Sequence, residues 1–95
     1  MKKVTQSTLA TELEQIPNIG KAVAGDLRLI GITKPAQLKG KDGLKLYDKL
    51  CAVSGERHDP CMADTLLAAV DFMNGGKPKP WYAFTHHRKK IFGNR

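Results

Sequence analysis

Residues 13–27 read LEQIPNIGKAVAGDL and predict two short helices joined by a tight corner. Pro17 removes a hydrogen-bond donor and disfavours helical geometry at Ile16, so we expect the first helix to end there. Asn18 and Gly20 are residue types that tolerate a positive φ, which a tight turn requires. Both isoleucines of the stretch are expected to point inward and to lock the corner.

The second helix of this pair is expected to begin at Gly20 and Lys21. The first amides of a helix have no acceptor within it, and the aligned peptide dipoles give that end a partial positive charge. Glycine leaves these amides unobstructed, and the lysine adds a full charge beside them. The corner is therefore a candidate phosphate site. The alternative is that it serves only to pack two helices together.

The rest of the chain also predicts helices. Leu9, Leu13 and Ile16 recur at spacings of four and three, as on one face of a helix. Periodicity and capping residues predict helices over about 9–16, 21–30, 33–40, 42–53 and 59–74. No stretch alternates long enough to build a sheet. We therefore expect an all-α fold, a compact bundle of about five short helices.

Charge divides the chain into two parts. The formal net charge is +7, and residues 76–95 carry six of the 16 Lys and Arg side chains but none of the nine Asp and Glu. We expect a helical domain over 1–76 and a basic, aromatic tail over 77–95, partly docked on the domain. Trp81 and Phe84 are expected to cover the core, the alternative being that they stack on unpaired bases. Residues 88–95 are expected to form a frayed, solvated end.

Composition excludes several classes of protein. The chain has 95 residues, which suit one domain, and no apolar run approaches the roughly 20 residues of a membrane span. No secretory signal is expected, and two cysteines suggest reduced thiols in the cytoplasm. Cys51 and Cys61 match no common zinc spacing, so we expect buried free thiols and no metal site. No catalytic constellation is visible, which predicts that the protein is not an enzyme.

The corner resembles the helix-hairpin-helix motif, which reads hydrophobic–Pro–Gly–hydrophobic–Gly and then alanine four residues later. Here Asn18 replaces the first glycine, and Ala24 supplies the alanine. A wider pattern resembles the bacterial pathogenicity-locus family, also described as mitomycin-resistance-type proteins, over roughly residues 9–85. The residues that carry it are Leu13 to Gly31, Lys39-Gly40, Leu46-Tyr47-Asp48-Lys49-Leu50-Cys51 and Asp59-Pro60-Cys61. The resemblance implies a SAM-like helical fold.

Such domains usually carry a second hairpin, which would lie here over residues 53–60. That segment lacks the Gly–hydrophobic–Gly run and contains Glu56 and Asp59, so we expect a degenerate hairpin that does not bind phosphate. Some hairpins of this type also hold a monovalent cation on turn carbonyls, which would be those of Ile16 and Ile19. No other cofactor is expected.

The resemblance implies DNA binding through the sugar-phosphate backbone, without sequence specificity. The implied contacts are Pro17, Asn18, Ile19, Gly20, Lys21, Ala22 and Val23. Secondary basic contacts are expected at Lys45, Lys49, Arg88, Lys89 and Lys90, although a lysine edge like that of the 42–53 helix is more often a solvated face than a binding stripe. A link to DNA repair or stress resistance is the corresponding biological expectation. The alternative function is a protein–protein adaptor that uses the helical bundle or the tail.

Overall fold

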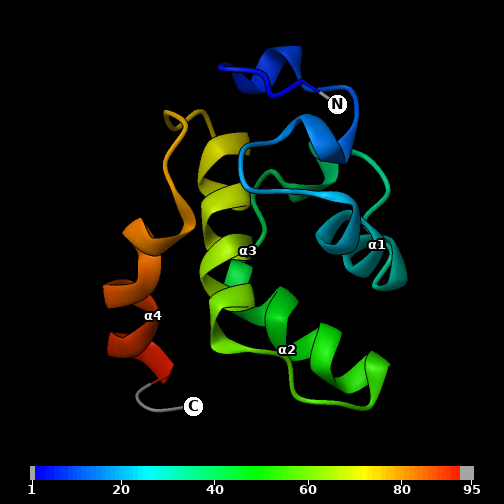
Figure 1. The fold of residues 1–95 in the computed structure, drawn as a ribbon, viewed down its shortest axis with the longest axis vertical. Helices are drawn as coiled ribbons and strands as arrows, with labels where there is room; N and C mark the ends of the chain where they lie inside the picture. Colours follow the sequence, from blue (N-terminus) through cyan, green and yellow to red (C-terminus); the bar gives the residue numbers. More distant parts are fainter. Residues whose placement is uncertain (1, 93–95) are drawn as a thin grey trace.

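A computed structural model describes residues 2–92 of the chain, and every regular element in that range is helical (Figure 1). The α-helices are α1 (Lys21–Leu29), α2 (Gly43–Ser54), α3 (Pro60–Met73) and α4 (Thr85–Phe92). Four 3₁₀ turns join them: η1 (Ser7–Leu9), η2 (Leu13–Gln15), η3 (Pro35–Leu38) and η4 (Trp81–Phe84). The predicted all-α fold is confirmed. Over residues 2–92, no helix combines the length and apolar character needed to cross a bilayer.

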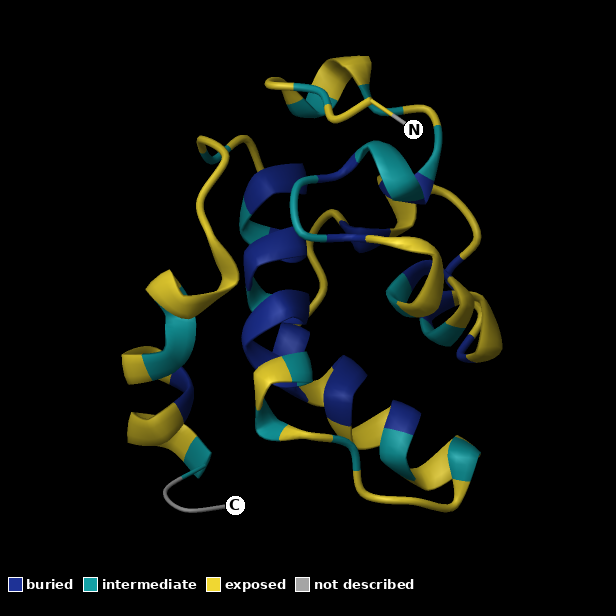
Figure 2. Ribbon diagram, in the orientation of Figure 1, coloured by how far each residue is buried: buried dark blue, intermediate teal, exposed yellow. Residues whose placement is uncertain are grey.

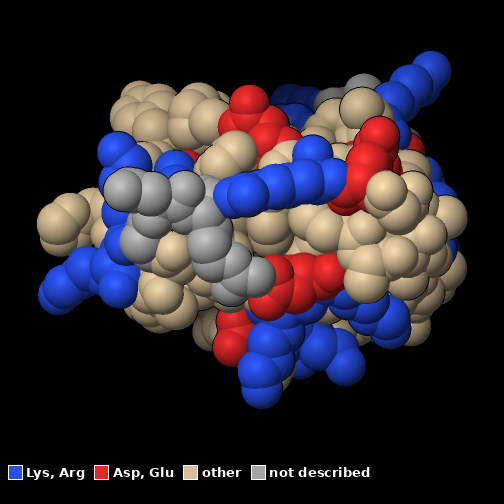
Figure 3. Space-filling model, turned by 90° about the horizontal axis from the view of Figure 1, so that it is seen from below, with Lys and Arg blue, Asp and Glu red and all other residues tan. Residues whose placement is uncertain are grey.

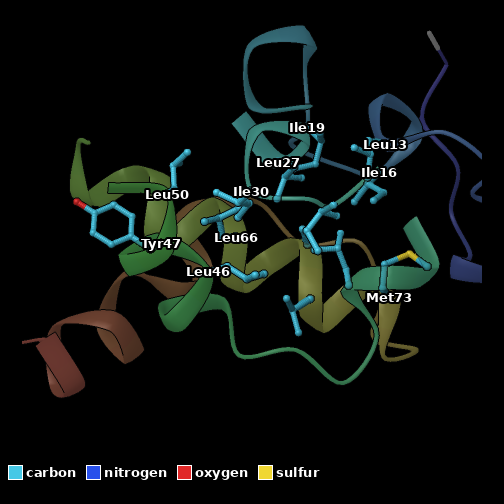
Figure 4. Close-up of a cluster of buried hydrophobic side chains, with 14 of the residues drawn as sticks. Leu13, Ile16, Ile19, Leu27, Ile30, Leu46, Tyr47, Leu50, Leu66 and Met73 are labelled. Atoms are coloured by element: carbon cyan, nitrogen blue, oxygen red, sulfur yellow. The ribbon is translucent and has the colours of Figure 1, made fainter. Parts of the chain in front are cut away.

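Helix α3 is the centre of the molecule, and the other elements pack around it (Figures 1 and 2). Most of its side chains are buried, whereas α1 and α2 bury one face each. The core is almost wholly aliphatic, and Figure 4 shows Leu13, Ile16 and Ile19 from the corner grouped near Leu27 of α1. The corner is thus anchored from within by apolar side chains that leave its outer side free.

Three of the predicted helices are confirmed, two of them with their capping side chains. Asp42 caps α2 by accepting hydrogen bonds from the amides of Leu44 and Lys45, and Asp59 caps α3 by accepting one from Cys61. Helix α1 begins directly after Gly20. These starts were predictable because a capping side chain and its helix are neighbours in sequence.

The helix predicted over residues 9–16 is wrong. Two 3₁₀ turns, η1 and η2, replace it, and the backbone between them is extended. The side-chain oxygen of Gln15 accepts hydrogen bonds from the amides of Thr11 and Glu12, at 2.8 and 2.9 Å, and so caps η2 instead of continuing a helix. The same device recurs before η3, which replaces most of the helix predicted over 33–40. There Gln37 accepts from the amides of Thr33 and Lys34.

The expected frayed end is wrong for residues 88–92, which belong to α4, although Lys89 and Lys90 are exposed to solvent as expected. Arg88 is only 7% exposed, and its guanidinium binds the fully buried carboxylate of Asp64, with Nε 2.9 Å from Oδ1. Thr85 donates a further hydrogen bond to Asp64. An ion pair between α3 and α4 thus holds the helix on the domain. Residues 93–95 lie outside the described part of the chain.

Candidate nucleic-acid interface

The corner between η2 and α1 is a β-turn over Ile16–Ile19, closed by a 3.1 Å hydrogen bond from the Ile19 amide to the Ile16 carbonyl. Pro17 occupies its second position and Asn18 its third, where φ is +72°. This is the pattern of a type II turn, which demands a residue that tolerates the left-handed region. Asn18 meets that demand as a glycine would, so the backbone keeps the hairpin geometry despite the replacement.

The start of α1 faces solvent. Gly20, Lys21 and Ala22 are all exposed, and no side chain forms a capping hydrogen bond at Gly20. A Cβ atom placed on Gly20 would meet nothing within 4 Å, so no contact inside the protein requires glycine there. The amides of the first turn of α1 are therefore left for solvent or for a ligand. Val23, half-buried, packs against the core and marks the inner boundary of this surface.

The two later helices begin differently. The carboxylate of Asp42 fills the start of α2, and that of Asp59 fills the start of α3. Because each carboxylate already accepts the first amides, a phosphate gains little at either place. The turn before α3 also exposes Glu56. The segment predicted to form a degenerate second hairpin thus has an acidic residue at its helix start. Among α1, α2 and α3, only α1 has a start without a side-chain cap.

Acidic charge near the corner is compensated. Glu14 lies in η2, and its carboxylate binds the guanidinium of Arg28 at 3.0 Å. The hydrogen bond from Arg28 lowers the pKa of Glu14 below its usual value. Glu14 is therefore ionised and paired at neutral pH, and its repulsion of an approaching phosphate is reduced by the neighbouring cation.

A lysine far away in sequence binds main-chain carbonyls on both sides of the turn. The ammonium of Lys3 donates hydrogen bonds to the main-chain carbonyls of Glu14, at 2.8 Å, and of Ile19. The Ile16 carbonyl accepts from the Ile19 amide, so both oxygens that the sequence suggested for a free cation have partners within the protein. Nothing in the sequence near the turn indicates this role for Lys3, because the contact spans 11 to 16 residues.

The segment that links α3 to η4 also touches the turn. The side-chain amide of Asn18 donates a 2.7 Å hydrogen bond to the carbonyl of Lys79. The ammonium of Lys79 binds Asp71 at 3.2 Å and lies over the ring of Phe84. This linker steadies Asn18 but leaves the exposed residues at the start of α1 uncovered.

The secondary basic residues separate into two groups. Lys45 and Lys49 on α2 and Lys89 and Lys90 on α4 are exposed and remain predicted contacts. Arg88 is a correction, because its guanidinium is buried and paired with the Asp64 carboxylate, so it is not presented to a phosphate on the surface. Figure 3 shows that the face seen from below mixes basic and acidic side chains, so it is not a uniformly basic surface.

The structure also shows how far the cysteines and aromatic residues discussed in the sequence analysis are buried. Cys51 is half-buried, but Cys61 in the first turn of α3 is exposed, so the expectation of two buried thiols is wrong for Cys61. Within residues 2–92, no group of three His, Cys, Asp or Glu side chains is arranged to hold a metal. Phe84 is half-buried and η4 packs on α3, whereas Trp81 is 37% exposed and lies edge-on to Tyr82.

Comparison with known proteins places the chain in a family. Residues 6–90 match the family described as Cdd1, pathogenicity locus. The chain is 39% identical over 85 residues to the mitomycin resistance protein McrB of Streptomyces lavendulae, an alignment that covers 90% of this chain and 81% of that protein. No solved structure matches it. The chain therefore belongs to the pathogenicity-locus family, whose members include mitomycin-resistance-type proteins.

Proposed function

We propose that this protein is a non-enzymatic DNA-binding protein that contacts the phosphate backbone through its single helix-hairpin-helix corner. The observation that carries the proposal is the start of α1, where exposed amides lack a side-chain cap and the space beside Gly20 is open. Lys21 stands exposed at the same point. Main-chain donors and one ammonium suit a phosphate but carry no information about base sequence, so binding is expected to be non-specific.

Each proposed contact has a defined role. The amides of Gly20, Lys21 and Ala22 bind phosphate oxygens, and the Lys21 ammonium adds charge. Pro17, Asn18 and Ile19 shape the turn, and Val23 anchors the helix start to the core. The exposed lysines of α2 and α4 add sequence-independent attraction. By its name, the Streptomyces relative confers mitomycin resistance, and we extend to this chain a role in resistance or DNA repair. The proposed location is the cytoplasm, where exposed thiols such as Cys61 stay reduced.

A titration of labelled DNA tests the proposal. Fluorescence anisotropy with a short duplex and the matching single strand, at two salt concentrations, gives affinity and its salt dependence. About three phosphate contacts predict a slope near −2.7 in a plot of log K against log salt for the duplex. Changing the base sequence should leave the affinity nearly unchanged. Absence of binding to either DNA at low salt would refute the proposal.

The hairpin is tested separately from general charge. Lys21→Glu should weaken binding strongly, because it places a like charge beside the phosphate. Lys49→Glu makes the same change in charge on exposed α2 and should weaken binding much less. Circular dichroism checks that both variants keep their helices. Equal loss of affinity in the two variants would mean that binding depends on net charge alone and that the hairpin does not contact the phosphate.

A second candidate function, the protein–protein adaptor, is favoured by one feature. An open groove of about 830 Å³ lies between α2, α3 and α4, with walls that include Leu44, Leu67 and Ile91. Ile91 is 59% exposed, as an apolar contact of a partner would be. An adaptor would bind its partner undiminished when Lys21 is replaced by Glu, whereas the DNA complex would not survive that change.

A further inference from the structure

The N-terminal segment holds a lysine in a fixed place against the hairpin. The amide of Val4 donates a 3.0 Å hydrogen bond to the carbonyl of Gln15, and the Val4 side chain packs on the core. These contacts bring the preceding residue, Lys3, to η2. Its ammonium then donates hydrogen bonds to the carbonyls of Glu14 and Ile19. The lysine is thus directed to two main-chain oxygens rather than to a carboxylate.

The Ile19 carbonyl is linked to the proposed phosphate site at Gly20 through a single planar peptide group. The carbonyl of Ile19 and the N–H of Gly20 belong to the same peptide, and in a trans peptide they point in opposite directions. The described chain contains no cis peptide bond. An ammonium that fixes the Ile19 oxygen on one side of this peptide therefore fixes the Gly20 N–H on the opposite side, at a residue that is exposed. It also polarises that peptide, which strengthens the N–H as a donor.

We propose that the Lys3 ammonium is the built-in cation of the hairpin, a positioning residue that fixes the Gly20 amide towards a phosphate. This inference rests on the proposed function of the same corner. It implies that the hairpin works without a free metal ion, because a tethered ammonium takes the place on the carbonyls of Glu14 and Ile19. Burial around Lys3 lowers the pKa of this ammonium, as expected for a cation drawn partly out of water.

The first test exchanges the tethered cation for a free one. Lys3→Met removes the ammonium but keeps an unbranched apolar stem, and Lys2→Met makes the same charge change at an exposed neighbour. Duplex affinity is measured at constant ionic strength in potassium chloride and in tetramethylammonium chloride, whose cation is too large for the carbonyl pair. The wild-type protein and Lys2→Met should bind alike in the two salts. Lys3→Met should bind about tenfold more weakly in tetramethylammonium, the loss expected for one charge-assisted hydrogen bond, and should recover in potassium.

Two outcomes of that titration would overturn the proposal. One is Lys3→Met matching Lys2→Met in tetramethylammonium, which would leave the ammonium without a role. The other is Lys3→Met remaining weak in potassium, which would show that the carbonyls do not form a cation site.

The second test needs no DNA and so separates this proposal from the proposed function. In a potassium-free sample of the wild-type protein, nuclear magnetic resonance should show hydrogen-bond couplings from the Lys3 ammonium to the carbonyl carbons of Glu14 and Ile19. The amide nitrogen of Gly20 should shift in Lys3→Met, return when potassium is added, and stay unchanged in Lys2→Met. Missing couplings would overturn the proposal even if the variant failed to fold. If the wild-type protein bound no DNA but the couplings were present, only the proposed function would fall.

Discussion

At the scale of single residues, the hairpin depends on one left-handed position. Asn18 has φ of +72°, a region that costs an ordinary residue about 1–2 kcal/mol. We therefore expect Asn18→Ala to lower the free energy of unfolding by about 1–2 kcal/mol, since it adds this strain and removes the bond to Lys79. Asn18→Gly loses only the exposed bond and should cost clearly less. Urea denaturation measures both, and equal losses would mean that the turn is not held in the left-handed region.

Gly20 is expected to matter for binding rather than for folding. Its backbone is extended, with φ of −97° and ψ of −171°, which any residue adopts, and a methyl group there would meet no protein atom. Gly20→Ala should change stability by less than about 1 kcal/mol, the cost of a poorer cap. Its methyl group would project into the open space at the start of α1, so we expect duplex affinity to fall several-fold.

Gly25→Ala is the control for this prediction, since Gly25 lies on the exposed side of α1 and should leave affinity unchanged. Undiminished binding by Gly20→Ala would show that no phosphate approaches this amide.

The residues of the turn could be identified from sequence because each acts through its own backbone. Proline, asparagine and glycine restrict or release the chain at their own positions, whatever surrounds them. Lys3 could not be found in this way. Its role depends on where the chain folds back, and an exposed lysine with the same neighbours in sequence would look identical.

At the scale of elements, α2 and α3 are in close backbone contact at Gly43. A Cβ atom at this position would lie 2.9 Å from the backbone Cα and N of Leu67. Backbone atoms cannot turn aside, so Gly43→Ala should push the helices apart and cost about 1–3 kcal/mol of stability. Gly25→Ala, inside α1 and in open space, should instead stabilise the protein by about 0.5–1 kcal/mol. Thermal denaturation of the two variants checks this, and shifts of the same sign would contradict it.

The attachment of α4 depends on the ion pair between Asp64 and Arg88. Arg88→Leu would leave the Asp64 carboxylate buried with the Thr85 hydroxyl donating to it but without its guanidinium partner, and such a loss costs about 3–5 kcal/mol. The double variant with Asp64→Leu removes the stranded charge and should be more stable than Arg88→Leu alone. Urea denaturation of the two variants compares them. A double variant less stable than the single one would mean that Asp64 stabilises the fold even without Arg88, and would contradict the expected cost of an unpaired buried carboxylate.

Local signals explain which elements were predictable. Helices α1, α2 and α3 have apolar periodicity and a cap or break next to them in sequence. The apolar residues of the 9–16 segment also have helical spacing. However, the side-chain oxygen of Gln15 accepts hydrogen bonds from the amides of Thr11 and Glu12, so a regular helix does not form there. Helix α4 has little apolar periodicity, and a buried pair 24 residues apart holds it in place, so no local pattern indicates it.

At the scale of the whole molecule, the distribution of charge over the surface sets the expected strength of DNA binding. The side seen in Figure 3 carries both signs and would not alone attract a polyanion strongly. The exposed surface at the start of α1 is small. The start of α3, where a second hairpin would bind phosphate, is already capped by the Asp59 carboxylate. We therefore expect weak binding that depends on a few well-placed donors together with exposed lysines, and that is sensitive to salt.

The most direct test of the DNA-binding account is a nuclear magnetic resonance titration of the ¹⁵N-labelled protein with a short duplex. Amide signals report each residue separately and so locate the bound phosphate without mutation. The account predicts that the largest shifts occur at Gly20, Lys21 and Ala22, with smaller shifts at the exposed lysines of α2 and α4. Shifts confined to α4, or the absence of shifts at the start of α1 when the duplex is bound, would contradict it.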